Sequence, residues 1–213
     1  MKKTALLFLI FIFAKSHAQV ITFTDANFKT RLLSANSINQ IALDLYGNPT
    51  VIDTNNNGEI EVSEAEGISY LDISSNNYPA NQKITYLNQI SYFVNLTNLN
   101  CAYNTITSLN IASLTSIDTF NCSNNAITSL NIQGLKNIFE LDCSNNRIAS
   151  LNINLLSNLQ VLDCSSNQLQ SLNIQGKTKL EVVNCYNNRI SSLTIQGLIN
   201  LQYIDLPIIT LLH

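Results

Sequence analysis

Residues 120–153 read FNCSNNAITSLNIQGLKNIFELDCSNNRIASLNI, which is nearly the same phrase written twice. A cysteine returns at the same place in each copy, and the spacing of 21 residues is kept along the chain by all five cysteines: Cys101, Cys122, Cys143, Cys164 and Cys185. Such even spacing indicates a structural register and not a set of reactive thiols. A fixed short period predicts a solenoid, in which each unit buries its apolar face against its neighbours.

Within each copy, two short segments alternate apolar and polar residues. Leu141-x-Cys143 and Leu151-x-Ile153 have a period of two, which predicts short strands with alternate side chains turned inward. The two strands lie 10 and then 11 residues apart, so each repeat forms two half-turns of one coil. Stacked coils then make two parallel ladders across a thin core, which is filled between the strands by Leu96, Leu114, Leu135, Leu156 and Leu198.

An asparagine follows each cysteine by three residues. At a sharp inward turn the backbone leaves amides and carbonyls unpaired, and a buried Asn carries both a donor and an acceptor to satisfy them. We therefore expect this column to stack from coil to coil: Asn104, Asn125, Asn146, Asn167 and Asn188.

The repeat resembles the leucine-rich-repeat family, whose signature L-x-x-L-x-L-x-x-N/C-x-L is matched by Leu96-x-x-Leu99-x-Cys101-x-x-Asn104-x-Ile106. The alternation of 10 and 11 residues is similar to the nested 21-residue bacterial class of these repeats. The resemblance covers about residues 68–206 and includes a weaker leading copy at Leu71–Asn77, with Ile73 in the cysteine position. It implies a mainly β, right-handed solenoid over residues 68–213, with two short parallel strands per coil and a small helical N-terminal cap.

The cysteine position points inward, where cysteine acts as a small hydrophobic residue. Neighbouring coils place successive cysteines about 5 Å apart, which keeps a disulfide open as an alternative. Parallel side chains that point the same way are poorly oriented for bridging, and five is an odd number. We expect buried free thiols without catalytic activity.

The N-terminus has the composition of a cleavable secretory signal. Lys2 and Lys3 precede the apolar run Ala5–Ala14, and the small residues Ser16 and Ala18 follow it. An uncleaved anchor is the alternative, because Lys15 departs from the usual pattern. Removal of residues 1–18 leaves eight basic and 14 acidic side chains, and this acidic balance argues against nucleic-acid binding.

Residues 53–64, DTNNNGEIEVSE, match the calcium-loop pattern D-x-[DN]-x-[DN]-G-x5-E. Side-chain oxygens at alternate positions can surround a hard cation, a glycine makes the sharp turn, and the last glutamate closes the site. The loop resembles those of EF-hand and dockerin modules, with calcium ligands expected from Asp53, Asn55, Asn57, Glu64 and the backbone carbonyl of Glu59. Glu61 could act through water. The alternative is an Asn-Gly-rich turn that holds no metal.

Residues 19–67 are predicted to form a cap over the first coil. TDANFKTRLL indicates a short helix that is capped at Thr24 or Asp25, and Ser63 is predicted to cap a second helical turn over 64–66. In this interpretation calcium stabilises the cap and takes no part in chemistry.

Three columns of residues are predicted to face outward from the first ladder, each repeating once per coil. One column is Asp or Asn, and a second is mostly Ser or Ala. Aromatic and apolar residues from these columns gather at one end beside the Asp/Asn column, which is typical of recognition surfaces. The candidate binding patch is Val161, Val182, Tyr186 and Tyr203, with Asp142 and Asp163 alongside. The alternative is a solvated sheet face that binds nothing.

The sequence argues against an enzyme. Its two histidines, His17 and His213, lie at the two ends, so no histidine triad or zinc site can form. Asp142 and Asp163 have the expected separation of a glycosidase pair, but a flat face offers no pocket. We expect a secreted, non-enzymatic module that binds a protein or glycan, with a structural spacer or a calcium-dependent carbohydrate-active solenoid as alternatives. The last coil carries Ile209 in place of the turn Asn and ends on apolar residues without a polar cap. We expect either that the native chain continues beyond His213 or that this end associates with a partner.

Overall fold

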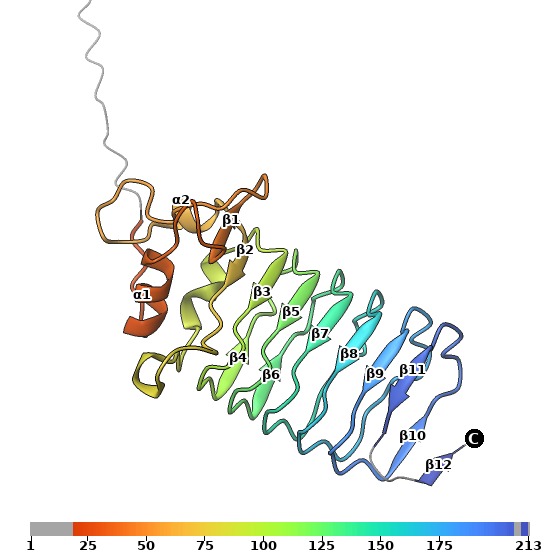
Figure 1. Cartoon of the computed structure of the whole chain (residues 1–213). Helices are drawn as coiled ribbons and strands as arrows, with labels where there is room; N and C mark the ends of the chain where they lie inside the picture. Colours follow the sequence, from red (N-terminus) through yellow and green to blue (C-terminus); the bar gives the residue numbers. More distant parts are fainter. Residues whose placement is uncertain (1–18, 207–209, 213) are drawn as a thin grey trace, which may run out of the picture.

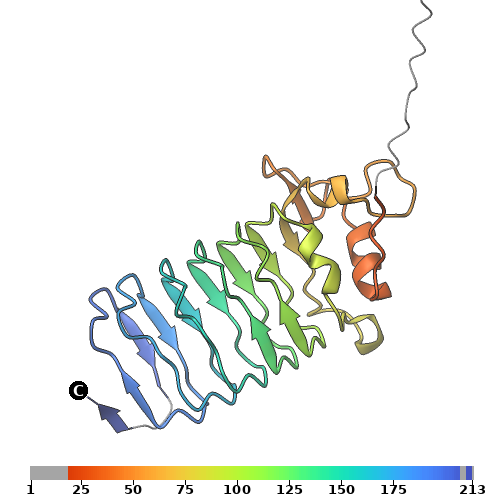
Figure 2. The same ribbon diagram turned by 180° about the vertical axis from the view of Figure 1, so that it is seen from behind.

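The computed structural model describes residues 19–206 and 210–212. The predicted leader at 1–18 and the tail residue Ile209 lie outside these ranges. The chain forms a mainly β solenoid with a helical cap at one end and the C-terminus at the other (Figures 1 and 2). Its first wall is an eight-stranded sheet in the order β1-β2-β3-β5-β7-β8-β9-β11. These strands are Ala42–Asp44, Ile68–Asp72, Asn98–Asn100, Thr119–Asn121, Glu140–Asp142, Val161–Asp163, Val182–Asn184 and Tyr203–Asp205.

From β3 onward the first wall advances by 21 residues per coil. Asn98 pairs with Thr119, Glu140 with Val161 and Val161 with Val182, all in parallel register. Coils of one length can stack in this way because each strand pairs with its equivalent in the next coil. The predicted solenoid and its period are confirmed.

The second wall is less regular than predicted. Its strands are β4 (Ser108–Asn110) paired with β6 (Ser129–Asn131), and β10 (Ser192–Thr194) paired with β12 (Thr210–Leu212). In the two middle coils the equivalent residues form no strand, although Leu151, Ile153, Leu172 and Ile174 are all buried there. Burial of alternate side chains therefore follows the repeat even where the ladder of backbone hydrogen bonds does not.

The core is one continuous cluster of buried apolar side chains that runs from the cap through the coils, between the two walls. All five cysteines are free and fully buried, as predicted. Burial raises the pKa of each of these thiols, and the pKa of Cys185 rises to about 11. A neutral, buried thiol in this position packs in the core as a small apolar side chain. Of the five leucines expected between the strands, four are fully buried and Leu198 is partly buried.

The asparagine column bonds each coil to the one before it. The Asn146 side-chain amide donates to the carbonyl oxygens of Cys143 and Ser144 in its own coil and of Cys122 in the preceding coil, at 3.0–3.1 Å. Its oxygen accepts from the Ile127 amide at 2.9 Å. Equivalent bonds are made by Asn104, Asn125, Asn167 and Asn188. The predicted role of this column is confirmed.

The residue before each column asparagine has a left-handed backbone. The φ angles are between 52° and 61° at Tyr103, Asn124, Asn145, Ser166 and Asn187. This conformation is costly for residues with a Cβ atom, and Asn tolerates it better than most. The Asn-Asn pairs in the sequence are thus explained by the left-handed backbone conformation required at the first residue of each pair.

The cap packs onto the first coil. Helix α1 (Ala26–Leu33) has Asp25 as its N-cap, which accepts from the Phe28 amide at 2.9 Å. β1 pairs antiparallel with β2 and so covers the edge of the first wall. Helix α2 (Val62–Ala65) begins earlier than predicted, and Glu61, not Ser63, caps it through reciprocal bonds with Glu64.

An insertion of two 3₁₀ helices, η1 (Ala80–Gln82) and η2 (Asn88–Tyr92), joins the cap to the first coil. Asp25 also accepts from the amides of Thr85 and Tyr86 at 2.7 and 3.0 Å. The same carboxylate therefore caps α1 and binds this insertion.

Candidate binding face and candidate calcium loop

The outward side of the first wall carries the candidate binding patch at its C-terminal end. Val161, Val182 and Tyr203 are direct neighbours in register on β8, β9 and β11. Inward residues alternate with them, so Leu162 and Val183 are buried while the two valines stay partly exposed. Tyr203 is 55% exposed. The structure thus brings three of the predicted residues into one row.

Tyr186 lies in the turn after β9 and is 56% exposed. In the preceding coils its column holds Ala102, Ser123, Ser144 and Ser165, which are all buried. These four residues are therefore covered, although the column was predicted to form part of the exposed outward face. Small side chains are covered where the coils stack, and Ser165 turns its hydroxyl back onto Asp163 at 2.6 Å. A tyrosine is too large to be covered in this way.

Asp142 and Asp163 face outward as neighbours in register, but they already have structural partners. The Asp142 carboxylate accepts from the Ser144 amide at 3.0 Å, and Asp163 accepts from the Ser165 amide at 2.9 Å. Asp163 also accepts from the Asn184 side chain at 3.0 Å. One oxygen of each carboxylate therefore closes a local turn, and a partner could contact only the remaining lone pairs.

This turn repeats along both walls, and sequence reasoning missed it. Every Asp or Asn of the column from Asp72 to Asn184 accepts from the amide two residues later. On the second wall Asn110, Asn131, Asn152 and Asn173 do the same. The signal was present in the sequence, because Asp or Asn recurs once per coil at these positions, with Thr194 as the exception in the last coil of the second wall.

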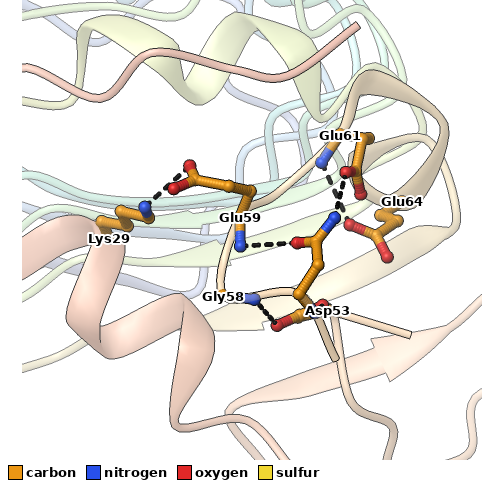
Figure 3. A network of polar contacts seen from close by, with 7 residues as sticks. Lys29, Asp53, Gly58, Glu59, Glu61 and Glu64 are labelled. Carbon is orange, nitrogen blue, oxygen red and sulfur yellow. Dashed lines mark hydrogen bonds and ion pairs between the residues drawn. The ribbon is translucent and has the colours of Figure 1, made fainter. Parts of the chain in front are cut away.

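The candidate calcium loop runs directly into α2, and its residues form a network of polar contacts (Figure 3). The Asp53 carboxylate accepts from the amides of Asn57 and Gly58 at 3.1 and 2.8 Å. Asn56 and Gly58 have positive φ angles of 56° and 79°, which allows the chain to curl around the Asp53 carboxylate. The Asn55 oxygen accepts from the Asn57 amide at 3.0 Å.

The end of the loop returns to its beginning through Glu64. This carboxylate accepts from the amide and hydroxyl of Thr54 at 2.7 and 2.9 Å, and from the Glu61 amide at 3.0 Å. Burial opposes ionisation of Glu64, but hydrogen bonds from Glu61 and Thr54 outweigh it, so the pKa of this carboxyl is lowered. Glu64 is thus charged and placed where the pattern expects the closing ligand.

The remaining residues of the loop are held by side-chain contacts. Asn55 and Asn57 donate from their amides to Glu61 at 3.0 and 2.7 Å, and Glu59 forms an ion pair with Lys29 at 2.8 Å. The Glu59 side chain is turned out of the loop toward α1 (Figure 3). Within residues 19–206 no three His, Cys, Asp or Glu side chains converge as a metal cluster. The expected ligands also include two asparagines and a backbone carbonyl, all of them oxygen donors that suit calcium.

Arg31 is a buried charged residue that joins the cap to the solenoid, and it was not predicted from the sequence. It is 5% exposed, donates to the Ser74 carbonyl at 2.6 Å and stacks on the Tyr78 ring at 3.5 Å. Its second nitrogen reaches the Ser75 hydroxyl, which in turn donates to Asn104 at 2.6 Å. The cap is therefore bonded to the asparagine column.

The sequence matches no protein-family model and no curated protein. Among solved structures, the chain resembles the leucine-rich-repeat protein LIC12759 of Leptospira interrogans, with 25% identity and a TM-score of 0.62. It also resembles the leucine-rich-repeat ectodomain of the plant membrane receptor kinase GASSHO1/SCHENGEN3 from Arabidopsis thaliana, solved with CASPARIAN STRIP INTEGRITY FACTOR 2, with 21% identity and a TM-score of 0.59. A third is the functional domain of InlJ from Listeria monocytogenes, which includes a cysteine ladder, with 23% identity and a TM-score of 0.48.

These matches cover 71%, 70% and 68% of this chain, respectively. They cover only 41%, 19% and 40% of the other chains, so this chain corresponds to less than half of each neighbour's length. The fold is thus that of leucine-rich-repeat proteins. None of the helices within residues 19–206 has the length and apolar character needed to cross a bilayer.

Proposed function

We propose that the chain is a secreted, non-enzymatic binding module that contacts an extracellular protein or glycan through the outward side of its first wall. The observation that carries this proposal is the row Val161, Val182 and Tyr203 with Tyr186 beside it. Tyr203 in this row and Tyr186 beside it are each more than half exposed, and the two valines are partly exposed. Exposed aromatic groups that flank fixed polar groups are common at binding hot spots.

The fixed polar groups are the Asp/Asn turns of the same wall. Because Asp142 and Asp163 are already held by backbone amides, they present their remaining oxygens in a set orientation and lose little conformational entropy on binding. The leucine-rich-repeat fold supports a role in recognition, since the plant neighbour was solved with a bound partner.

The binding test uses Tyr186→Ser with Tyr203→Ser, and Tyr46→Ser as a matched control. Tyr46 is 91% exposed but lies in the cap. The immobilised chain is screened against glycans and extracellular proteins, and the affinity of each ligand found is then measured for both variants. We expect at least a tenfold loss, about 1.4 kcal/mol, for the double variant and no change for the control. Absence of any ligand would favour the structural spacer, and an equal effect of both variants would place the site elsewhere.

We also propose that the loop 53–64 binds calcium and stabilises the cap. All expected ligand positions carry oxygen donors, and the loop already turns around Asp53 with Glu64 closing it. Two asparagines lower the ligand charge, so the expected Kd is on the order of 0.1 to 1 mM. At 10 mM calcium this stabilises the chain by about 1.4 to 2.7 kcal/mol.

Calorimetric titration and thermal unfolding with and without calcium test this proposal. Asp53→Ala should abolish both the heat and the gain in stability. Glu59→Gln is the matched control, because only the backbone carbonyl of this residue is expected to bind the metal. If the unmodified chain shows neither heat nor stabilisation, the loop is an Asn-Gly turn without metal.

A further inference from the structure

The second wall has an open edge at its N-terminal end. In the second coil this wall is formed by β4. In the first coil the chain instead continues after Leu87 into the 3₁₀ helix η2 and forms no strand there. β4 pairs only with β6 in the described part of the chain. One edge of β4 therefore faces η2 without a neighbouring strand.

The register shows which backbone groups point to this edge. Ser108 and Asn110 are the Cα partners of Ser129 and Asn131, and the Ile111 amide donates to the Asn131 carbonyl at 3.1 Å. Residues along a parallel strand bond alternately to the two sides. The amides and carbonyls of Ser108 and Asn110 thus point away from β6, and these two amides donate to no acceptor within residues 19–206.

A hollow of about 550 Å³ lies in front of this edge. Its volume is within the range of ligand pockets. Leu87 and Leu109 are buried beneath it, while the strand residues beside them expose polar side chains. The lining residues are all uncharged: Leu87, Asn88, Ser91, Ser108, Leu109, Asn110, Ala112 and Ser113.

We propose that this hollow binds an extended, uncharged peptide segment of a partner protein, which adds to β4 as a further strand. Two amides and two carbonyls in one row match the main chain of an extended peptide. No charged side chain is present to compensate a charged ligand residue, so charged segments are disfavoured. This site lies on the wall opposite the candidate binding patch and is independent of it.

The chain itself supplies a probe for the test. The hexapeptide ITSLNI occurs at residues 106–111 and again at 127–132, so it already pairs with itself across β4 and β6. A fluorescein-labelled peptide ITSLNIQ, copying residues 127–133, is titrated with the whole chain and followed by anisotropy. We expect saturable binding. Ser108→Lys should weaken it at least tenfold, because an edge lysine blocks strand addition. Ser129→Lys on β6, also exposed, should change it less than twofold.

Two N-methylated peptides test the pairing without altering the protein. One peptide is N-methylated at Leu and at the Ile that follows Asn, and the other at Ser and Asn. The two peptides therefore lack the backbone N–H donors on opposite edges of the extended strand. Strand addition predicts that one peptide loses binding and the other keeps it, and that bound peptide slows hydrogen exchange at Ser108 and Asn110. No binding at millimolar concentration, or equal behaviour of the two peptides, would overturn the proposal. Self-association that the peptide dissociates would assign the edge to a second copy of the chain and would also overturn it.

Discussion

The side-chain oxygen of Asn146 accepts a hydrogen bond from the Ile127 amide, 19 residues earlier and one coil below. The same side chain donates to three carbonyls, so a single residue satisfies four backbone groups at the turn. Each coil is thereby completed by the next one.

Asn146→Asp should be strongly destabilising. The substitution keeps the shape and the acceptor but removes every donor and places a negative charge against three carbonyl oxygens. Loss of these bonds in a buried site costs roughly 3 kcal/mol or more. Urea unfolding measures the change, and Asn145→Asp is the control, because that neighbour is exposed and donates only at 3.4 Å to a serine hydroxyl. Equal effects of the two variants would contradict the role of the column.

The buried thiols predict that stability falls at alkaline pH. Burial raises the pKa of all five in the folded chain, to about 11 at Cys185, whereas an unfolded cysteine ionises near 8.5. The unfolded chain therefore loses protons first, and stability that is complete below about pH 8.5 is lost as the pH rises toward the folded pKa values. Each thiol contributes up to about 1.4 kcal/mol per pH unit.

Urea midpoints between pH 7 and 10 measure this effect, and a thiol reagent provides a second measurement. The native chain should react slowly, and the unfolded chain should yield five equivalents. A midpoint that stays constant across this pH range, or rapid labelling of the native chain, would show that the thiols are accessible.

Ser166→Asn should stabilise the chain. Ser166 has a φ angle of 52°, and Asn occupies the equivalent position in three other coils. Asn adopts the left-handed conformation at lower cost, and it retains an acceptor for the Asn187 side chain that now donates to Ser166 at 3.2 Å. A gain of about 0.5 to 1 kcal/mol is expected in thermal unfolding. Ser171→Asn, at an exposed position without a positive φ angle, serves as control and should be neutral.

Arg31→Gln should loosen the cap. Arg31 loses its bond to the Ser74 carbonyl and its stacking on Tyr78, at a cost of about 2 kcal/mol. Hydrogen exchange should become faster in α1 and β1 and remain unchanged in β8 and β9. Lys29→Gln on the same helix removes only a partly exposed ion pair and should cost less than about 1 kcal/mol. Similar exchange in the two variants would argue against the link through Arg31.

The regular part of the fold follows from the sequence because its causes are local and repeated. The cysteine spacing, the alternation around Leu141 and the asparagine column each recur in successive coils, so one physical reason predicts all copies. The start of α1 was also readable, since Asp25 combines an acceptor side chain with the apolar period that follows.

Other features depend on contacts that no local pattern records. Arg31 meets Ser74 across 43 residues, and η2 replaces a strand although Leu87 fits the repeat. The hydrogen bonds of Asp142 and Asp163 to their own backbone were not predicted. The sequence pattern of an outward-facing Asp is the same whether its carboxylate binds a partner or a backbone amide of its own turn. Calcium binding by the loop 53–64 stays a prediction.

The asparagine bonds have the same offsets in every coil from Asn125 to Asn188, reaching back 19 and 24 residues each time. Gain or loss of 21 residues within this stretch would leave every remaining contact with an equivalent partner. Duplication or deletion of one 21-residue unit in the gene therefore yields a longer or shorter solenoid without repacking of the core. Evolution can in this way change the length of the solenoid one coil at a time.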